Sequence, residues 1–250
     1  MTILWKSGHF VGLALAFGLS LGAASLAATS ADAEVAKKPL TVIELYTSQG
    51  CSSCPPADTY LGELSKRDDI LALSLHVDYW DYIGWKDPFA NPKHTDRQRD
   101  YAVNFGMGYV YTPQMVIQGM THATGSSHDE VEKVIQELQG AKRVDVRLDR
   151  QGDGFKVTVP GASSHDDAAV WLVVFDREHE TKIKRGENAG KTLAYHNVVR
   201  QMKRIGTWRG STLKLDVSNA QMAADGRDGC AVLVQSLRNG RILGAAKLDL

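Results

Sequence analysis

The stretch Thr41-Val-Ile-Glu-Leu-Tyr-Thr-Ser-Gln-Gly-Cys-Ser-Ser-Cys-Pro-Pro-Ala-Asp58 decides the fold. Its apolar first half predicts a buried strand, and the segment after the second cysteine has the apolar spacing of a helix. The cysteines thus lie at a helix N-terminus, where unpaired N–H groups and the helix dipole stabilise a thiolate. We expect Cys51 to be the nucleophile, nearer the solvent, and Cys54 to resolve a mixed disulfide. A structural disulfide and half of a metal site are the alternatives.

Residues 1–33 have the three parts of a secretory signal peptide. A short polar start carries one lysine, the run from Phe10 to Leu21 is apolar and uncharged, and Ala31-Asp32-Ala33 is a cleavage sequence. Cleavage is expected after Ala33, with Ala27 and Ala28 as alternative sites. The apolar run is too short for a good membrane span, and no second one follows. The sequence therefore predicts a soluble periplasmic or secreted protein.

Export changes what the cysteines imply, because disulfides persist outside the cytosol. A bridge across two residues closes a very small loop and gives little entropic stabilisation. The chain from Glu34 to Leu250 is also long enough to bury an ordinary core. A role in thiol exchange is therefore favoured over a structural role. The third cysteine, Cys230, begins the apolar run Cys-Ala-Val-Leu-Val and is expected to be buried in a strand.

Composition excludes two classes of partner. The 29 basic residues equal the 29 acidic residues in number, so the chain is neutral. A neutral chain lacks the basic footprint of a nucleic-acid-binding protein. It also lacks the polybasic amphipathic pattern of a protein that lies on a membrane surface.

Residues 34–142 predict a first domain with the element order β-α-β-α-β-β-α. Asn91-Pro92 is expected to cap the second helix, Gln118-Gly119 to turn a hairpin, and Ser127-x-x-Glu130 to form a capping box before the third helix. The expected strands are 41–46, 70–77, 115–117 and 120–123, and the expected helices begin at Cys54, Pro92 and Ser127.

This order resembles the thioredoxin fold, and a second motif supports the resemblance. Thr112-Pro113 directly precedes the third strand, where thioredoxin-like proteins have a cis-proline beside the reactive cysteines. The resemblance implies that Pro113 is cis and that Thr112 presents its backbone to a substrate. Proline is the residue for which a cis bond is least unfavourable. An ordinary trans proline at the start of a strand is the alternative.

More narrowly, the chain resembles a family of exported bacterial proteins known as domain of unknown function 1223. The family implies a thioredoxin-like fold but supplies no substrate. The segments that carry this resemblance are Glu44–Asp58, Val77–Asp81, Gly84–Pro88, Val110–Met115, Gly186–Gly190 and Tyr195–Arg200.

The first domain departs from standard thioredoxins between and before the cysteines. The intervening dipeptide is Ser-Ser, whose hydroxyl groups could donate hydrogen bonds to a Cys51 thiolate. Thioredoxin has a buried strand acid that accepts a proton, and Glu44 is the nearest candidate here. The loop after it is one residue longer, so Glu44 could instead be a capping or surface acid.

Aromatic residues follow the second strand. Because loops at the carboxyl ends of parallel strands form the ligand crevice, Trp80 and Trp85 are candidates for the wall of a substrate groove. The alternative is that they only pack the loop onto the domain.

Residues 143–250 predict a second, mostly-β, sandwich-like domain. Thr181–Thr192 is expected to be an exposed hairpin arm, and Gly186 and Gly190 to form a tight turn rather than a phosphate loop. Without a catalytic motif, this domain is expected to orient a partner or form an oligomer contact. Its expected strands are 144–148, 155–159, 170–175, 193–204, 212–217, 230–237 and 241–248.

The sequence thus predicts an exported thiol-disulfide oxidoreductase that acts on protein thiols or disulfides through Cys51 and Cys54 and needs no organic cofactor. The first alternative is a Cu(I)-binding protein or metallochaperone, because soft thiolates select Cu(I). Its further ligand would be His76, His94 or His122, although none has motif spacing to the cysteines. The second alternative is a non-catalytic binding module that uses only the aromatic groove.

Overall fold

The computed structural model describes residues 1–5, 8–9, 39–163, 167–218 and 227–250. Lys37–Leu250 form one compact unit, and Met1–Ala36 form another. The expected signal peptide and its cleavage sites lie almost entirely outside the described residues.

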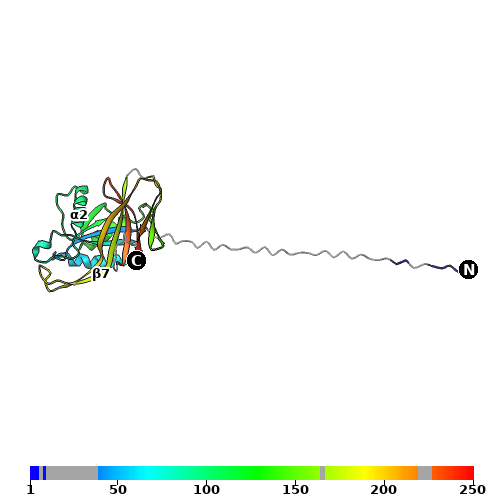
Figure 1. Ribbon diagram of the computed structural model, residues 1–250, viewed down its shortest axis with the longest axis horizontal. Coiled ribbons are helices and arrows are strands. Elements are labelled where there is room, and N and C mark those ends of the chain that lie inside the picture. The colour runs from blue at the N-terminus through cyan, green and yellow to red at the C-terminus, as the bar shows by residue number, and fades with distance from the viewer. Residues whose placement is uncertain (6–7, 10–38, 164–166, 219–226) are drawn as a thin grey trace. The chain divides into compact units, whose positions relative to one another are not determined.

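The centre of the large unit is an eight-stranded sheet with the order β11-β10-β7-β8-β2-β1-β3-β4 (Figure 1). Strands β1 (Thr41–Thr47) and β2 (Ile70–His76) are parallel neighbours and are buried along their whole length. This burial explains their almost continuous apolar sequences. On the other side of β1, the short hairpin of β3 (Gln114–Ile117) and β4 (Thr121–Thr124) completes the edge.

The other half of this sheet comes from the C-terminal part of the chain. Ser74 of β2 pairs with Val198 of β8 in parallel. The two regions that the sequence divides at residues 142 and 143 therefore contribute strands to one sheet, and the independence of either region stays a prediction. The bounds are β7 Ala168–Lys182, β8 Thr192–Trp208, β10 Gly229–Ser236 and β11 Ile242–Asp249.

Helices cover both faces of the sheet. Leu61 of α1 (Pro55–Ser65) and Ile135 of α3 (His128–Glu137) pack with Ile43 of β1 on one face. Tyr101 of α2 (Pro92–Asn104) packs with Val42 on the other face. The alternation of side chains along β1 therefore sends odd-numbered residues toward α1 and even-numbered residues toward α2.

The predicted helix starts are found, with one difference in capping. Asn91 caps α2 by accepting a hydrogen bond from Lys93 N, as expected. Ser127 is the N-cap residue of α3, but its side chain makes no capping hydrogen bond, so the expected capping box is not formed. A short 3-10 helix, η1 (Asp81–Ile83), lies in the loop after β2.

A second, three-stranded sheet packs on the C-terminal half of the large sheet. It consists of β5 (Arg147–Gln151), β6 (Gly154–Val159) and β9 (Leu213–Ser218) in the order β5-β6-β9. Phe155 and Val157 meet Leu172 and Cys230 in one hydrophobic core. Cys230 is a buried free thiol, as expected. The sequence predicts the strands after residue 142 as a separate sandwich-like domain. In the structure, one layer is the three-stranded sheet, and the other layer (β7, β8, β10 and β11) is part of the eight-stranded sheet.

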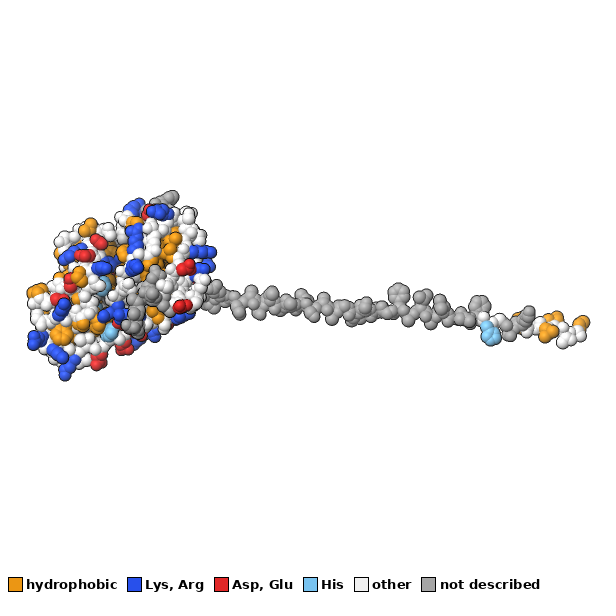
Figure 2. Space-filling view, viewed as in Figure 1, with side chains coloured by type: hydrophobic (Ala, Val, Ile, Leu, Met, Phe, Trp, Pro, Cys, Tyr) orange, Lys and Arg blue, Asp and Glu red, His pale blue; other side chains and the backbone are white. Residues whose placement is uncertain are grey.

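The charged side chains on the surface are of both signs, in agreement with the neutral composition. On the face seen in Figure 2, both positive and negative side chains are present. Within the described ranges, no helix is long and apolar enough to cross a membrane.

Candidate functional site

The two cysteines form a disulfide at the N-terminus of α1. Their sulfur atoms are 2.11 Å apart, and Cys54 is the N-cap residue of the helix. Ser52 and Ser53 are exposed, but both cysteines have an exposed fraction of 0%. The expectation that Cys51 lies nearer the solvent than Cys54 is therefore wrong for this oxidised state. We call residues 48–54 the cysteine loop.

Trp80 connects the cysteine loop to the segment before β3. The Thr112–Pro113 peptide bond is cis, as expected. The indole Nε1 of Trp80 donates a hydrogen bond to Thr112 Oγ1 at 2.8 Å. A Cβ atom at Gly50 would lie 3.1 Å from the Cβ of Trp80, so the loop passes close to this side chain. Trp80 is half-buried and lies between Gly50 and Thr112.

Gln49 is the centre of a hydrogen-bond network beside the disulfide, and it is fully buried. Its backbone N–H donates to Asp87 Oδ2 at 2.8 Å. Its side-chain oxygen accepts from Trp85 Nε1 at 2.8 Å, and its side-chain nitrogen donates to Thr181 Oγ1 at 3.2 Å. Trp85, the other expected groove residue, is thus joined directly to the cysteine loop.

Asp87 also forms a buried pair with His76 at the end of β2. The distance from His76 Nδ1 to Asp87 Oδ2 is 2.6 Å, and both side chains have an exposed fraction of 0%. Burial by itself would raise the pKa of Asp87. The imidazole of His76 and the N–H groups of Gln49 and Phe89 outweigh burial and hold this pKa below its usual value. Asp87 therefore anchors the cysteine loop as a carboxylate.

Asp58 is a buried carboxyl group one helical turn after Cys54, and its backbone N–H donates to Cys54 O at 3.1 Å. Neither carboxyl oxygen has a hydrogen-bond partner among the described residues. Burial raises the pKa of Asp58 to about 7, and nearby His76, followed by the adjacent Thr47 hydroxyl group, opposes the rise. Asp58 can therefore change its protonation state near neutral pH.

Other unpartnered polar atoms gather around Asp58, between α1 and the ends of the parallel strands. Thr47 is the register partner of His76, and the rings of His76 and Tyr195 are 4.9 Å apart. Burial, and then the charge of Asp58, raise the pKa of Tyr195. Buried polar groups without partners are unfavourable, so such a cluster suits bound water or a transferred proton. The buried side-chain atoms without hydrogen-bond partners on these residues of the described chain are Thr47 Oγ1, Ser74 Oγ, His76 Nε2 and Tyr195 OH.

Glu44, the expected proton acceptor, lies in a different cluster. Arg97 Nε and Nη2 donate to its two carboxylate oxygens at 2.7 and 3.1 Å, and Tyr101 OH donates at 2.6 Å. Because strand alternation turns residue 44 toward α2, Glu44 is not placed to take a proton from either cysteine. It is fully buried, so it is not a surface acid either.

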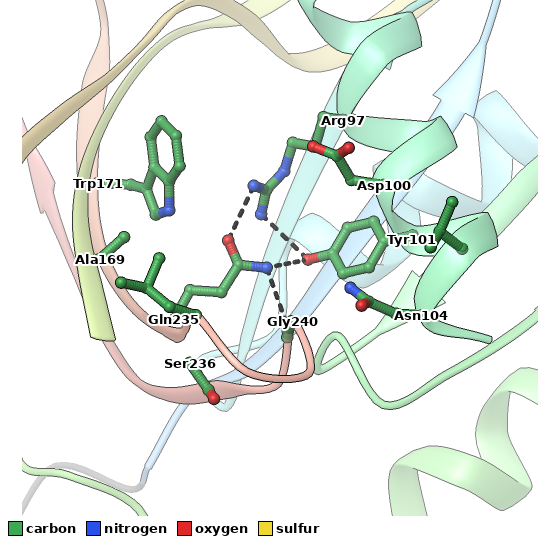
Figure 3. Close-up of a pocket in the computed structure, with 11 residues that line it drawn as sticks. Arg97, Asp100, Tyr101, Asn104, Ala169, Trp171, Gln235, Ser236 and Gly240 are labelled. Carbon is green, nitrogen blue, oxygen red and sulfur yellow. Dashed lines mark hydrogen bonds between the residues drawn. The ribbon is translucent and has the colours of Figure 1, made fainter. Parts of the chain in front are cut away.

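A pocket of about 310 Å³ adjoins this second cluster (Figure 3). In Figure 3, Gln235 points between Arg97 and Tyr101 and bonds to both, at 2.9 Å in each case. The Arg97 guanidinium also lies 5.7 Å from the ring centre of Trp171. The lining residues do not include the cysteine loop or Thr112–Pro113, so the pocket is separate from the disulfide site.

Most residues at the tip of the β7–β8 hairpin, residues 183–191, are exposed, as expected. Two buried side chains nevertheless dock this tip on the cysteine loop. Ile183 and Asn188 are buried. The side-chain Nδ2 of Asn188 donates hydrogen bonds to Gln49 O at 3.0 Å and to Cys51 O at 2.9 Å. The C-terminal region therefore contributes a side chain to the disulfide site. Gly186 and Gly190 have positive φ angles, which fits the expected tight turn.

Two of the histidines considered as copper ligands, His94 and His122, lie next to polar groups other than the cysteines. His94 Nδ1 is 3.0 Å from His76 O, burial lowers the pKa of His94 to about 4, and His122 Nδ1 is 2.9 Å from Tyr111 OH. In the part of the chain that the structure describes, no three His, Cys, Asp or Glu residues are grouped to hold a metal ion.

Comparison with known proteins places the chain in a family. Residues 42–235 match the family described as "Protein of unknown function (DUF1223)". The chain belongs to this family. No curated protein matches it.

Two solved structures resemble this DUF1223 protein. The crystal structure of an Agrobacterium tumefaciens protein, a structural genomics target, has 32% sequence identity and a TM-score of 0.71; the match covers 85% of this chain and 96% of that chain. HBP35 of Porphyromonas gingivalis has 13% identity and a TM-score of 0.57, over 85% of this chain and 76% of that chain. The second likeness concerns the fold alone.

Sequence reasoning missed three residues of the site: Gln49, Asp58 and Asn188. Asp58 left a usable signal, since it is an acidic residue on the helix face that also carries Ala57 and Leu61. Gln49 and Asn188 left no such signal, because their roles depend on contacts between segments that are distant in sequence.

Proposed function

We propose that this DUF1223 protein is an exported, thioredoxin-like thiol-disulfide oxidoreductase that acts on cysteines of other proteins. The observation that carries the proposal is the Cys51–Cys54 disulfide at the N-terminus of a helix that follows a buried strand. The cis Thr112–Pro113 bond, joined to the loop through Trp80, supports it. The element order from β1 to α3 supports the thioredoxin-like fold.

The exchange takes place in two balanced steps. A substrate thiolate attacks Cys51 Sγ, the bond to Cys54 breaks, and Cys54 leaves as a thiolate that takes up a proton. A second substrate thiolate then attacks the substrate sulfur of the mixed disulfide, and Cys51 leaves as a thiolate that takes up a second proton from the solvent. The substrate has lost two electrons and two protons, and the protein has gained them. The reverse steps transfer electrons to a substrate disulfide.

Asp58 is the proton donor and acceptor for Cys54 in this proposal. The two residues are four apart on α1 and therefore share one helix face. A carboxyl group whose pKa is about 7 can give up and take back a proton near neutral pH. Asp58 thus takes the role for which Glu44 is the nearest candidate in the sequence.

Export is the part of the proposal that rests on the first 33 residues. A disulfide is the oxidised state expected outside the cytosol, and the signal-peptide pattern supplies the route. The substrates are then proteins of the same oxidising compartment.

Covalent trapping tests the function. We expect Cys54→Ser to accumulate mixed disulfides between Cys51 and its protein partners, because no thiol remains to release them. Cys51→Ser should trap few, and Cys230→Ser should behave as the unmodified protein because Cys230 is buried. The measurement is non-reducing electrophoresis of the exported fraction, followed by identification of the trapped partners. Equal, near-zero trapping by Cys54→Ser and Cys51→Ser would refute the proposal.

A further inference from the structure

One side chain of the C-terminal region, Asn188, forms two hydrogen bonds to the cysteine loop and one within the hairpin tip. Its Nδ2 donates to Gln49 O and Cys51 O, and its Oδ1 accepts from Lys191 Nζ at 2.9 Å. A lysine ammonium group can only donate, so this contact fixes which end of the amide faces the loop. The two carbonyl groups that Asn188 binds lie on either side of Gly50.

The loop is held from the same direction by two further contacts. Thr181 of β7 and Trp85 both bond to the side chain of Gln49. Asn188 and Gln49 are fully buried, so water competes little for these hydrogen bonds. The position of Cys51 therefore depends on the docked hairpin tip as well as on α1.

We infer that Asn188 is a positioning residue that keeps the cysteine loop in the conformation in which the two sulfur atoms can join. The inference rests on the proposed function in one respect, namely that the Cys51–Cys54 pair is reduced and reoxidised. When two glutathione molecules reduce the disulfide, two thiols and one glutathione disulfide are formed. A restrained loop keeps these two thiols close, so their effective concentration stays high and ring closure is favoured.

Asn188 also controls access to Cys51. The cysteine is fully buried in the oxidised protein, so a thiolate reaches its sulfur only after part of its cover moves. Loss of the two hydrogen bonds from Asn188 makes this movement easier. The disulfide should then be both less stable and faster to react.

Equilibration of Lys37–Leu250 with glutathione redox buffers tests the inference. We expect Asn188→Ala and Asn188→Asp to lower the equilibrium constant for disulfide formation about tenfold, which raises the redox potential by about 30 mV. The rate of reduction by glutathione should rise in both variants. Trp85→Phe, which removes only the indole donor to Gln49, should shift both quantities less and in the same direction.

Asn197→Asp is the matched control. Asn197 also donates its side-chain amide to a backbone carbonyl, that of Ala72 on β2, at 2.9 Å. The substitution Asn197→Asp should lower the unfolding free energy and leave the redox potential of the Cys51–Cys54 pair unchanged. An equal potential shift in Asn197→Asp would show a general effect of stability and overturn the inference.

Two further results would contradict the inference that Asn188 positions the cysteine loop. The inference is wrong if the Asn188 variants fold and keep the equilibrium constant within twofold, or if they fail to fold and Trp85→Phe causes no shift. If glutathione cannot reversibly reduce even the unmodified protein, the proposed function fails, and the inference falls with it.

Discussion

Asp58 and Glu44 are both buried acids, yet their surroundings give them different roles. Arg97 and Tyr101 bind both carboxylate oxygens of Glu44, whereas the oxygens of Asp58 have no partner among the described residues. Burial of Asp58 without hydrogen-bond partners favours its protonated form, which raises its pKa to about 7. These different surroundings are the reason that we propose Asp58, and not Glu44, as the proton-transfer group.

The first prediction concerns Asp58→Asn and the pH dependence of stability. The pKa of Asp58 is raised in the folded state, to about 7, so its contribution to stability is fully present below about pH 4 and is lost as pH rises to about 7. From pH 4 to pH 8, we expect the difference in unfolding free energy between Asp58→Asn and the unmodified protein to shift in favour of Asp58→Asn, by on the order of 4 kcal/mol.

Urea denaturation between pH 4 and pH 8 measures this effect as the difference between the two proteins. A difference is needed because buried His94, with its pKa lowered to about 4, contributes in the opposite sense. The exposed Asp129 provides the control, since Asp129→Asn should show no comparable pH-dependent difference. A constant difference between Asp58→Asn and the unmodified protein from pH 4 to pH 8 would contradict the assignment.

The second prediction concerns the buried pair of Arg97 and Glu44. Arg97→Met leaves a buried carboxylate without its charge partner and should lower the unfolding free energy by about 3–5 kcal/mol. The double variant Glu44→Gln/Arg97→Met should recover most of this loss. Neither variant should change the redox potential, because Glu44 lies in a separate cluster, bound to Arg97 and Tyr101.

Arg99 provides the matched control for Arg97. Its pair with Asp96 is exposed, with side-chain exposed fractions of 61% and 69%, so Arg99→Met should change stability by less than about 1 kcal/mol. If the redox potential differed between Arg97→Met and Glu44→Gln/Arg97→Met, Glu44 and not Asp58 would be the proton acceptor.

Single residues could be predicted from the sequence where their role is local. Cys51, Cys54 and the cis Pro113 belong to short motifs, and the structure confirms their conformation. Asn188 binds a residue 137 positions away in the chain. No local pattern encodes such a contact, so only the folded chain reveals it.

At the level of elements, α1 and β8 approach each other closely through Gly62. A Cβ atom at this position would lie 2.3 Å from Cδ2 of His196. The helix can therefore come this near the strand only because residue 62 lacks a side chain.

The third prediction follows from this contact. In a free helix, Gly62→Ala would stabilise by about 1 kcal/mol, but here we expect it to destabilise by about 1–3 kcal/mol because the methyl group overlaps His196. Removal of the ring in Gly62→Ala/His196→Ala should restore part of the loss. Thermal and urea unfolding measure both, and a more stable Gly62→Ala protein would show that α1 does not pack on β8 in this way.

Most elements could be predicted from hydrophobic periodicity, but not their full extent. The expected strand 193–204 is part of the longer β8, and 170–175 is part of β7. The additional residues at the hairpin end are mostly polar and alternate poorly. They form strands because β7 and β8 pair through Lys182 and Thr192, near the docked tip.

For the whole molecule, the decisive feature is the core that both predicted regions share. Side chains of β1, β2 and α2 pack together with side chains from beyond residue 142, among them Val173, Phe175, Val199 and Leu233. The change of periodicity at residue 143 was visible in the sequence. The parallel pairing of β2 with β8 was not, because it joins strands more than a hundred residues apart.

The fourth prediction concerns a fragment that ends at the expected boundary. Residues 37–142 alone would expose the apolar surface of this core and the free edge of β2. In contrast to the separate first domain that the sequence predicts, we therefore expect the fragment to show no cooperative urea transition, whereas Lys37–Leu250 should unfold cooperatively. A cooperative transition of the fragment, with the Cys51–Cys54 pair still reversibly oxidised, would demonstrate an independent N-terminal domain.

The long separation between Cys51 and Asn188 has a kinetic consequence. An exported chain enters its folding compartment starting from its N-terminal part, so both cysteines arrive before the residue that restrains their loop. Contacts between distant segments also form slowly, since a large loop must close first. During that interval the thiols are open to any oxidant the nascent chain meets. Docking of Asn188 is thus a late maturation event, and the reactivity of a newly made molecule differs from that of a finished one.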